Sequence, residues 1–383
     1  MRALFKIQTS AIFGLFFIAG CGAPEENSEP LEIATSIAAS DDVVAMEILE
    51  DPFIWLEEVE GTNALAWAAE QNALSIPRLQ GDPRFETIRS EIEAVLTSED
   101  RIPSGSLVNG RVYNFWQDND HVRGILRCTA LESYADDNPD WETVLDIDEL
   151  ATIENANWVY KGRTCLPSNP TRCLIHLSDG GKDAVVIREF DLDAANFIDG
   201  GFFVGEAKTN IDWVDANTLL VGSDFGEGSL TTSGYARTLR LWKRGTALEN
   251  AEQIIETVVE DMSVGAFSVL ADESDLSFVV RRPDFFTEET WLLTEQGILA
   301  KLPLQIDANF QGVLGQRGLV LLRSDWTLAD GESYAAGSLV SLDLLASIRT
   351  QTPVAITTVL NPKTNDQLDA ISSIGITSDS VYV

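Results

Sequence analysis

The stretch 201–245 constrains the fold of this 383-residue chain more than any other. Two short apolar runs, 211–213 and 218–221, flank a turn, and a glycine-rich loop at 222–234 leads into another alternating run. Short runs rich in Val, Ile, Phe, Tyr and Trp alternate with turn residues in the same way from Leu107 to the last residue. Such alternation with frequent turns predicts antiparallel β-sheet.

The strand pattern recurs at roughly 45–55 residues per group of four strands, which is the period of propeller blades. The expected blade starts are Trp116, Trp158, Trp213, Ser268, Gly312 and Ile371. Periodicity alone does not separate a propeller from a large sandwich or a β-solenoid. We therefore predict an all-β repeat architecture over 101–383, with an incomplete β-propeller of roughly five to six blades as its expected form.

A short α-helical segment, 49–100, precedes the strands. Its alanine-rich part, 63–74, is predicted to be a helix that Thr62 caps and that stops before Pro77. Asp82 is expected to cap a second helix, whose apolar residues recur at helical spacing: Phe85, Ile88, Ile92 and Val95. Both helices carry an apolar stripe that needs a partner, and the rest of the chain shows no obvious one.

The first residues, 1–20, have the features of a bacterial lipoprotein signal peptide. Arg2 and Lys6 precede an apolar stretch that is too short to span a bilayer, and the segment ends at Cys21 after two small residues. We expect Cys21 to carry a lipid; the alternative is an ordinary signal peptide with an incidental cysteine. The acidic, polar segment 21–48 is predicted to be a flexible tether. These features predict a lipid-anchored, extracytoplasmic location in the bacterial cell envelope.

The remaining cysteines are interpreted in this oxidising setting. Cys165 and Cys173 flank a loop with two prolines between two strand-like runs, so they form either a disulfide or two free buried thiols. Cys128 is expected in the core. With only His121 and His176 in the chain, no cluster has zinc-site spacing, and no metal or organic cofactor is indicated.

The charge balance is strongly acidic, with 61 Asp and Glu against 26 Lys and Arg and a net charge of −35. Such a surface repels phosphate backbones, so we expect no nucleic-acid partner. Neighbouring acids could in principle form a glycosidase pair, although in so acidic a chain turn residues are the simpler interpretation. These acids are Asp136, Asp137, Asp140, Asp146, Asp148, Glu149, Glu288 and Glu289.

An ordered set of segments resembles the N-terminal half of prolyl oligopeptidase-family serine peptidases. The set runs from Asp51 to about Gly245, and weaker similarity continues to the C-terminus. It comprises DPFIWLEEVEG with ALAWAAEQN, RVYNFWQDNDHVRGILRCTALESY, WETVLDIDELA, LSDGGKDAVVIREFDL and GEAKTNIDWVDANTLLVGSDFGEGSLTTSGYARTLRLWKRG. No single motif is decisive, but the ordered set is specific.

This resemblance implies a seven-bladed propeller that caps an α/β-hydrolase domain carrying Ser, Asp and His. It implies that the helices of 49–100 pack on that domain, which would account for their unpartnered apolar stripes. The implied activity is endopeptidase cleavage of oligopeptides by acyl transfer, with the propeller as a size-selective gate. The family prefers to cleave after proline, and related members prefer basic residues.

The sequence departs from the family at the nucleophile. No Gly-x-Ser-x-Gly elbow is present, although five serines lie near glycines: Ser104, Ser106, Ser229, Ser233 and Ser338. His121 and His176 are expected to be structural, and 222–234 lacks the lysine of a phosphate-binding loop. We therefore expect a truncated chain with no catalytic residue, inactive without a C-terminal hydrolase domain. The alternative is a non-catalytic binding or scaffold propeller lipoprotein.

Overall fold

The structure is a computed structural model that describes residues 51–383 with short gaps. The gaps are Val59, Glu99, Asp272, Glu273, Asn365, Asp366, Asp369, Ala370 and Ser378. The chain divides into two compact units, Met1–Ser98 and Glu99–Val383, which are described separately. The predicted signal peptide, the lipidation site Cys21 and the tether up to residue 48 lie outside the described residues.

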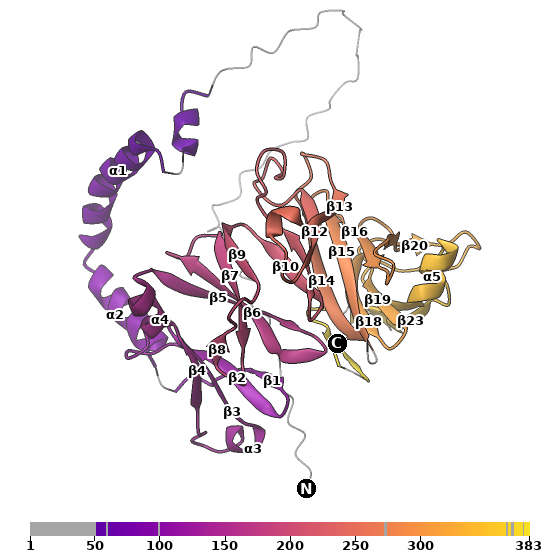
Figure 1. Ribbon diagram of the computed structural model, residues 1–383, viewed down its shortest axis with the longest axis horizontal. Helices are drawn as coiled ribbons and strands as arrows, with labels where there is room; N and C mark the ends of the chain where they lie inside the picture. The colour runs from indigo at the N-terminus through magenta and orange to yellow at the C-terminus, as the bar shows by residue number, and fades with distance from the viewer. Residues whose placement is uncertain are drawn as a thin grey trace, which may run out of the picture. The chain divides into compact units, whose positions relative to one another are not determined.

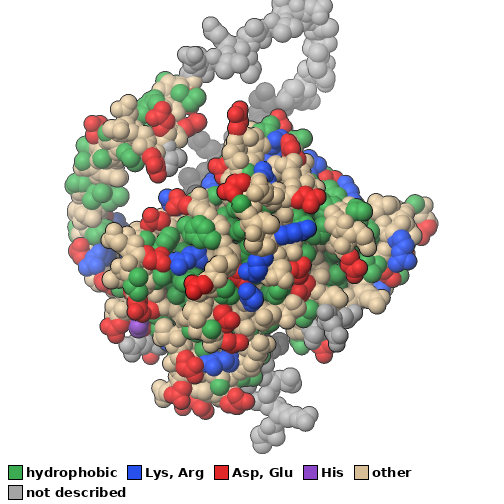
Figure 2. All heavy atoms as spheres, in the orientation of Figure 1, with side chains coloured by type: hydrophobic (Ala, Val, Ile, Leu, Met, Phe, Trp, Pro, Cys, Tyr) green, Lys and Arg blue, Asp and Glu red, His purple; other side chains and the backbone are tan. Residues whose placement is uncertain are grey.

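The first unit contains a 3-10 helix, η1 (Ile54–Glu57), and two α-helices, α1 (Thr62–Gln80) and α2 (Phe85–Leu96). In α1 only Ala64 is buried, and in α2, which is likewise fully described, no residue is buried. Figure 2 shows hydrophobic side chains along α1 at the surface. The large exposed apolar residues of the two helices are Leu65, Trp67, Leu74, Ile76, Leu79, Ile88, Ile92, Val95 and Leu96.

Three details of these helices differ from the prediction. Helix α1 continues through Pro77 to Gln80, because a proline removes only its own N–H and its carbonyl still accepts a 2.9 Å bond from the Gly81 N–H. Thr62 is the first helical residue and not the cap. Asp82 accepts a 2.9 Å bond from the Arg84 N–H but lies outside α2.

No helix in the described part of the chain is long and apolar enough to cross a membrane.

The second unit is built from five successive antiparallel sheets, shown in Figure 1. The first contains β1 (Ser106–Val108), β2 (Arg111–Trp116), β3 (Ile125–Ala130) and β4 (Glu142–Asp146). The second contains β5 (Trp158–Leu166), β6 (Asn169–Asp179), β7 (Val185–Asp191), β8 (Asn196–Phe197) and β9 (Phe203–Ala207). The third contains β10 (Asn210–Asp215), β11 (Thr218–Gly222), β12 (Thr238–Lys243) and β13 (Glu252–Glu256).

The fourth sheet contains β14 (Ser263–Ala271), β15 (Ser274–Arg282), β16 (Glu289–Leu293) and β17 (Leu299–Lys301). The fifth contains β18 (Asn309–Leu314), β19 (Arg317–Leu321), β22 (Leu339–Asp343) and β23 (Thr357–Leu360). Two-stranded pairs follow or interrupt them: β20 (Trp326–Thr327) with β21 (Ser333–Tyr334), β24 (Lys363–Thr364) with β25 (Gln367–Leu368), and β26 (Gly375–Ile376) with β27 (Val381–Tyr382). Short helices lie between strands: α3 (Leu131–Tyr134), α4 (Ile147–Glu154), η2 (Leu248–Asn250) and α5 (Leu344–Thr350).

This arrangement confirms the predicted all-β propeller. The first strands of consecutive sheets contact one another in the order β5, β10, β14, β18 and β26, as blades do around a central channel. Trp158, Trp213, Ser268 and Gly312 lie in first strands as predicted. The prediction for Trp116 was wrong: it ends β2, so the first blade begins one strand earlier, at β1.

The core is divided among the seams between sheets. Four hydrophobic clusters are present in the described residues, and each joins two consecutive sheets. At the seam of the second and third sheets, the fully buried Trp213 donates its indole N–H to the Thr164 carbonyl at 3.0 Å and packs edge-on against Phe202. Burial of such large rings supplies much of the stability of a seam.

A buried carboxylate also connects the two sheets of this seam through hydrogen-bonded ion pairs. Glu189 of β7 has a fully buried side chain that contacts Arg172 at 2.6 Å and both terminal nitrogens of Arg244 at 2.7 and 2.9 Å. The Phe202 N–H donates to its second oxygen at 2.8 Å. Burial alone would raise the pKa of Glu189, but the bonds from Arg244, Phe202 and Arg172 outweigh it and hold the pKa below its usual value.

A second, half-buried carboxyl lies where the third and fourth sheets meet. Asp212 of β10 accepts the Trp213 N–H at 2.7 Å and the Ser268 N–H at 3.2 Å, but no cation is paired with it in the described residues. Burial raises the pKa of Asp212 to about 7; the two N–H bonds oppose this shift, and the charge of Asp275 adds to it. Asp212 therefore titrates near neutrality.

We expect the free energy of unfolding to contain a pH-dependent part that Asp212→Asn removes. The pKa of Asp212 is raised from 3.8 to about 7 on folding, so the folded chain retains a proton that the unfolded chain has released. The stabilisation is complete below the pKa that Asp212 has in the unfolded chain, and it is lost as the pH rises through the pKa that it has in the folded chain. The free energy of unfolding therefore falls by at most about 1.4 kcal/mol per pH unit over this range. Urea unfolding at several pH values from about 5 to about 8 measures it. Parallel curves for wild type and Asp212→Asn would contradict the assignment, and exposed Asp199→Asn is the matched control.

Candidate functional site

An open, shallow concavity of the second unit lies between the first strands of the first two blades. It has a volume of about 420 Å³. It is lined by Ser106 and Val108 of β1, Tyr160, Gly162, Arg163 and Cys165 of β5, and Pro170 of β6. Since first strands surround the channel of a propeller, the cavity lies on the inner side of this seam.

An irregularity in β5 decides which side chains reach the cavity. Tyr160 pairs with Leu177, but Gly162 pairs with His176, so Lys161 is an extra residue and β5 bulges there. As a result Tyr160, Arg163 and Cys165 all stand opposite odd-numbered residues of β6 and share one face of the sheet. Gly162 has a φ of +114°, a conformation that side chains with a Cβ rarely adopt.

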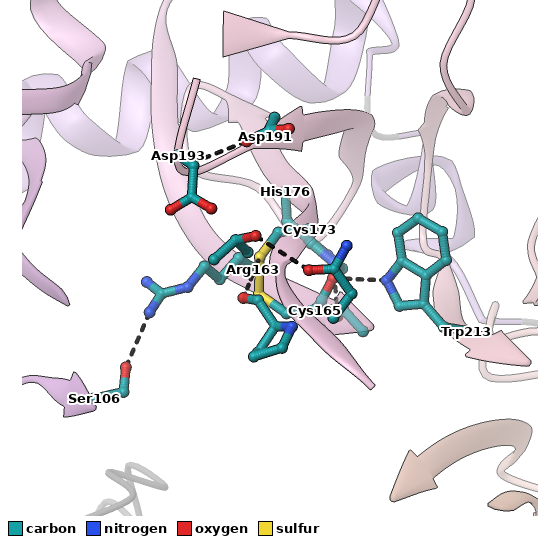
Figure 3. The surroundings of a disulfide bond; sticks show 12 residues. Ser106, Arg163, Cys165, Cys173, His176, Asp191, Asp193 and Trp213 are labelled. Atoms are coloured by element: carbon teal, nitrogen blue, oxygen red, sulfur yellow. Dashed lines mark hydrogen bonds between the residues drawn. A yellow bond between two sulfur atoms is a disulfide. The ribbon is translucent and has the colours of Figure 1, made fainter. Parts of the chain in front are cut away.

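Arg163 is the charged residue of the cavity. Figure 3 shows its side chain extending from β5 toward Ser106, whose Oγ accepts its Nη2–H at 2.9 Å. The guanidinium carbon also lies 5.5 Å from the centre of the Tyr113 ring. Burial raises the pKa of Tyr113 to about 12 and that of Tyr160 in the same direction, so both phenols stay neutral.

A disulfide forms one edge of the cavity. Cys165 and Cys173 are directly opposite in the β5–β6 hairpin and are joined through their sulfur atoms, 1.95 Å apart. Cys173 is fully buried and Cys165 is half-buried, so the bond ties the cavity wall to the core of the seam. Cys128 is a free thiol buried in the neighbouring cluster.

The two histidines make local contacts. His176 lies 3.1 Å from the Thr164 hydroxyl, and burial lowers its pKa to about 4. The Nδ1 atom of His121 lies 2.9 Å from an oxygen of Asp118 in a turn. Among the described residues, neither ring has a hydrogen bond to a serine hydroxyl, so no Ser–His pair is assembled there.

Ser229 of the glycine-rich loop 222–234 is held by hydrogen bonds within the loop. The loop joins β11 to β12, which are neighbours in one sheet, and it carries the buried Ser229. The Ser229 hydroxyl donates to the Gly226 carbonyl at 2.6 Å and accepts the Phe225 N–H at 2.9 Å. These bonds fold the loop on itself.

The acidic pairs take structural roles. Asp146 caps α4 by accepting the Glu149 N–H at 2.9 Å, and Asp148 accepts the Arg123 N–H at 2.9 Å. Glu289 pairs with Arg281 at 2.8 Å and also contacts Lys301. Within the described residues, no group of three or more His, Cys, Asp or Glu is placed to hold a metal.

Sequence reasoning missed Tyr160, Gly162 and Arg163 as a unit. The strand predicted at Trp158–Tyr160 was too short, because β5 continues past Gly162 to Leu166. The available signal was the isolated Gly162 inside an otherwise strand-like run, which is typical of a bulge.

Comparison with known proteins places this geometry in a family context. The N-terminal β-propeller domain of prolyl oligopeptidase matches residues 36–373. An uncharacterized peptidase of Sinorhizobium fredii is 36% identical over 82% of this chain and 44% of its own length, and one of Rickettsia prowazekii is 33% identical over 86% and 47%. The structure of a post-proline cleaving enzyme from Rickettsia typhi is 31% identical, with a TM-score of 0.76 over 85% of this chain and 49% of that one.

We expect the Cys165–Cys173 bond to form when the protein folds under oxidising conditions. A tryptic digest prepared without reductant should contain the segments 164–172 and 173–182 as one cross-linked species, which reductant separates. Replacing both cysteines with serine should lower the free energy of unfolding by about 2–3 kcal/mol, as expected for so short a loop. The doubly substituted chain should no longer respond to reductant. Recovery of both thiols in alkylated form from the unreduced protein would refute the pairing.

Proposed function

The chain belongs to the prolyl oligopeptidase family, and from that premise we propose that it is the propeller-bearing N-terminal part of a serine-type endopeptidase acting on short peptides. The observation that carries the proposal is the family match over residues 36–373, which covers most of the chain. The chain spans about half the length of the curated relatives it matches, 44% and 47% of them.

We place the catalytic Ser, Asp and His in a C-terminal α/β-hydrolase domain that this chain does not include. The lack of a Gly-x-Ser-x-Gly elbow in the sequence supports this. So do the local contacts of His121 and His176. The exposed apolar faces of α1 and α2 support it as well, because a hydrolase domain packed on them would remove this surface from water.

The propeller then acts as a size-selective gate. Its channel would admit extended oligopeptides and exclude folded proteins from the serine. The similarity to a post-proline cleaving enzyme at 31% identity favours cleavage after proline, with cleavage after basic residues as the alternative to be tested.

We expect the protein expressed from the complete reading frame to cleave a short peptide at an internal proline. A folded protein that contains proline should survive the same treatment, and a matched peptide with arginine in place of proline tests the alternative preference. Treatment with a serine-directed sulfonyl fluoride should reduce the rate to background. The 383-residue chain alone should give no hydrolysis. A complete gene product without serine-dependent cleavage would instead favour a binding propeller.

We further propose that the mature protein is held in the bacterial cell envelope by a lipid on Cys21. The apolar segment followed by a small-residue pair and a cysteine supports this. Cells supplied with radiolabelled fatty acid should incorporate label into the protein, and Cys21→Ser should abolish both labelling and partition into detergent. Cys128→Ser is the matched control, since a buried core thiol should not change either property. An unlabelled wild-type protein would rule out the anchor.

A further inference from the structure

The arginines near the blade seams fall into two groups, those that pair with a carboxylate and those that do not. Arg172 and Arg244 pair with Glu189, Arg188 pairs with Glu154, and Arg281 pairs with Asp261. Arg163 forms no ion pair with any described residue, although the chain has 61 acidic side chains against 26 basic ones. Arg123, Arg127 and Arg240 also have no carboxylate partner, but they donate to the Trp158 carbonyl, the Asn114 amide oxygen and the Glu249 carbonyl. Arg163 differs from them because it lines the concavity.

The backbone is shaped to place this cation in the cavity. The extra residue Lys161 and the positive φ of Gly162 reverse the alternation of β5, so that Arg163 joins Tyr160 and Cys165 on the cavity face. Regular alternation from Tyr160 would have put Arg163 and Cys165 together on the face opposite to Tyr160. Bulges of this kind are common beside functional sites, where they redirect a side chain.

The structural contacts of Arg163 use only part of its guanidinium, which donates one N–H to Ser106 and lies over the Tyr113 ring. Its hydrogen bond to Ser106 joins β5 to β1, but a hydroxyl acceptor needs only a neutral donor. A guanidinium has five N–H donors in a planar fork, which matches two oxygens of a carboxylate or of a phosphate, and of these two groups a peptide carries the carboxylate.

We propose that the cavity between β1 and β5 binds a peptide carboxylate through Arg163. Val108, Tyr160 and Pro170 supply apolar walls for the residue that bears the carboxylate, and the volume of about 420 Å³ is of the size that holds small ligands. That the ligand is a peptide rests on the proposed function. The carboxylate is either the C-terminal one or that of an acidic side chain, and both offer the same two oxygens.

Fluorescence anisotropy tests the proposal on the complete gene product after treatment with a serine-directed sulfonyl fluoride, so that no peptide is cleaved. The probes are three dye-labelled peptides of equal length: one with a free C-terminus, its C-terminal amide, and the amide with one internal glutamate. Wild type should bind the free acid about tenfold or more tightly than the plain amide, the range expected for a charge-assisted pair. If the glutamate peptide also binds tightly, the site accepts any peptide carboxylate. If the glutamate peptide binds as weakly as the plain amide, the site is specific for the C-terminal carboxylate. Both outcomes support the proposal.

Arg163→Gln should bind all three peptides with the weak affinity that wild type has for the plain amide. Arg349→Gln removes the same charge from an exposed position on α5 and should behave like wild type. Equal binding of acid and amide by wild type, absence of binding, or a preference that survives in Arg163→Gln overturns the proposal. The wild-type comparison needs no variant, so it stands even if Arg163→Gln folds poorly. Cleavage is measured separately, so loss of peptidase activity would overturn the proposed function and leave this result intact.

Discussion

The buried Glu189 carboxylate is the constraint on which the packing of the second blade against the third depends. Its desolvation is tolerable only because Arg172 of its own sheet and Arg244 of the next sheet both reach it. The Arg244 guanidinium also contacts the Ala216 carbonyl at 2.7 Å, so one residue links the β10–β11 turn to β7. Satisfying this carboxylate fixes the register in which Trp213 and Phe202 meet, and hence the seam next to the Arg163 cavity.

Much of the fold was predictable because it depends on local alternation. The runs 211–213 and 218–221 lie in β10 and β11, and Trp158, Trp213, Ser268 and Gly312 lie in first strands. The predicted start Ile371 lies in no strand, since β26 begins at Gly375. The exception at Trp116 has a physical reason. Strand β1 has only three residues, two of them exposed, so it carries no alternating apolar signal and is defined by its pairing with β2.

The candidate site was less predictable, since it depends on register. The cysteine pair could be proposed from its flanking strands. That Tyr160 lies on the same face of the sheet as Cys165 is due to the bulge at Lys161, and this bulge is seen only in the pairing of β5 with β6. Arg163 looks like an ordinary strand arginine until the pairing shows which way it points. Pro77 illustrates the same limit in a helix, where neighbouring hydrogen bonds outweigh a local breaker.

The division of the core into one cluster per seam has a mechanical consequence. Each cluster packs only the two sheets beside it, so each blade is stabilised by contacts with its immediate neighbours. Such an assembly can part at one seam while the groups on either side remain packed. The seam that holds Glu189 resists such parting, because opening it would leave this buried carboxylate without Arg244.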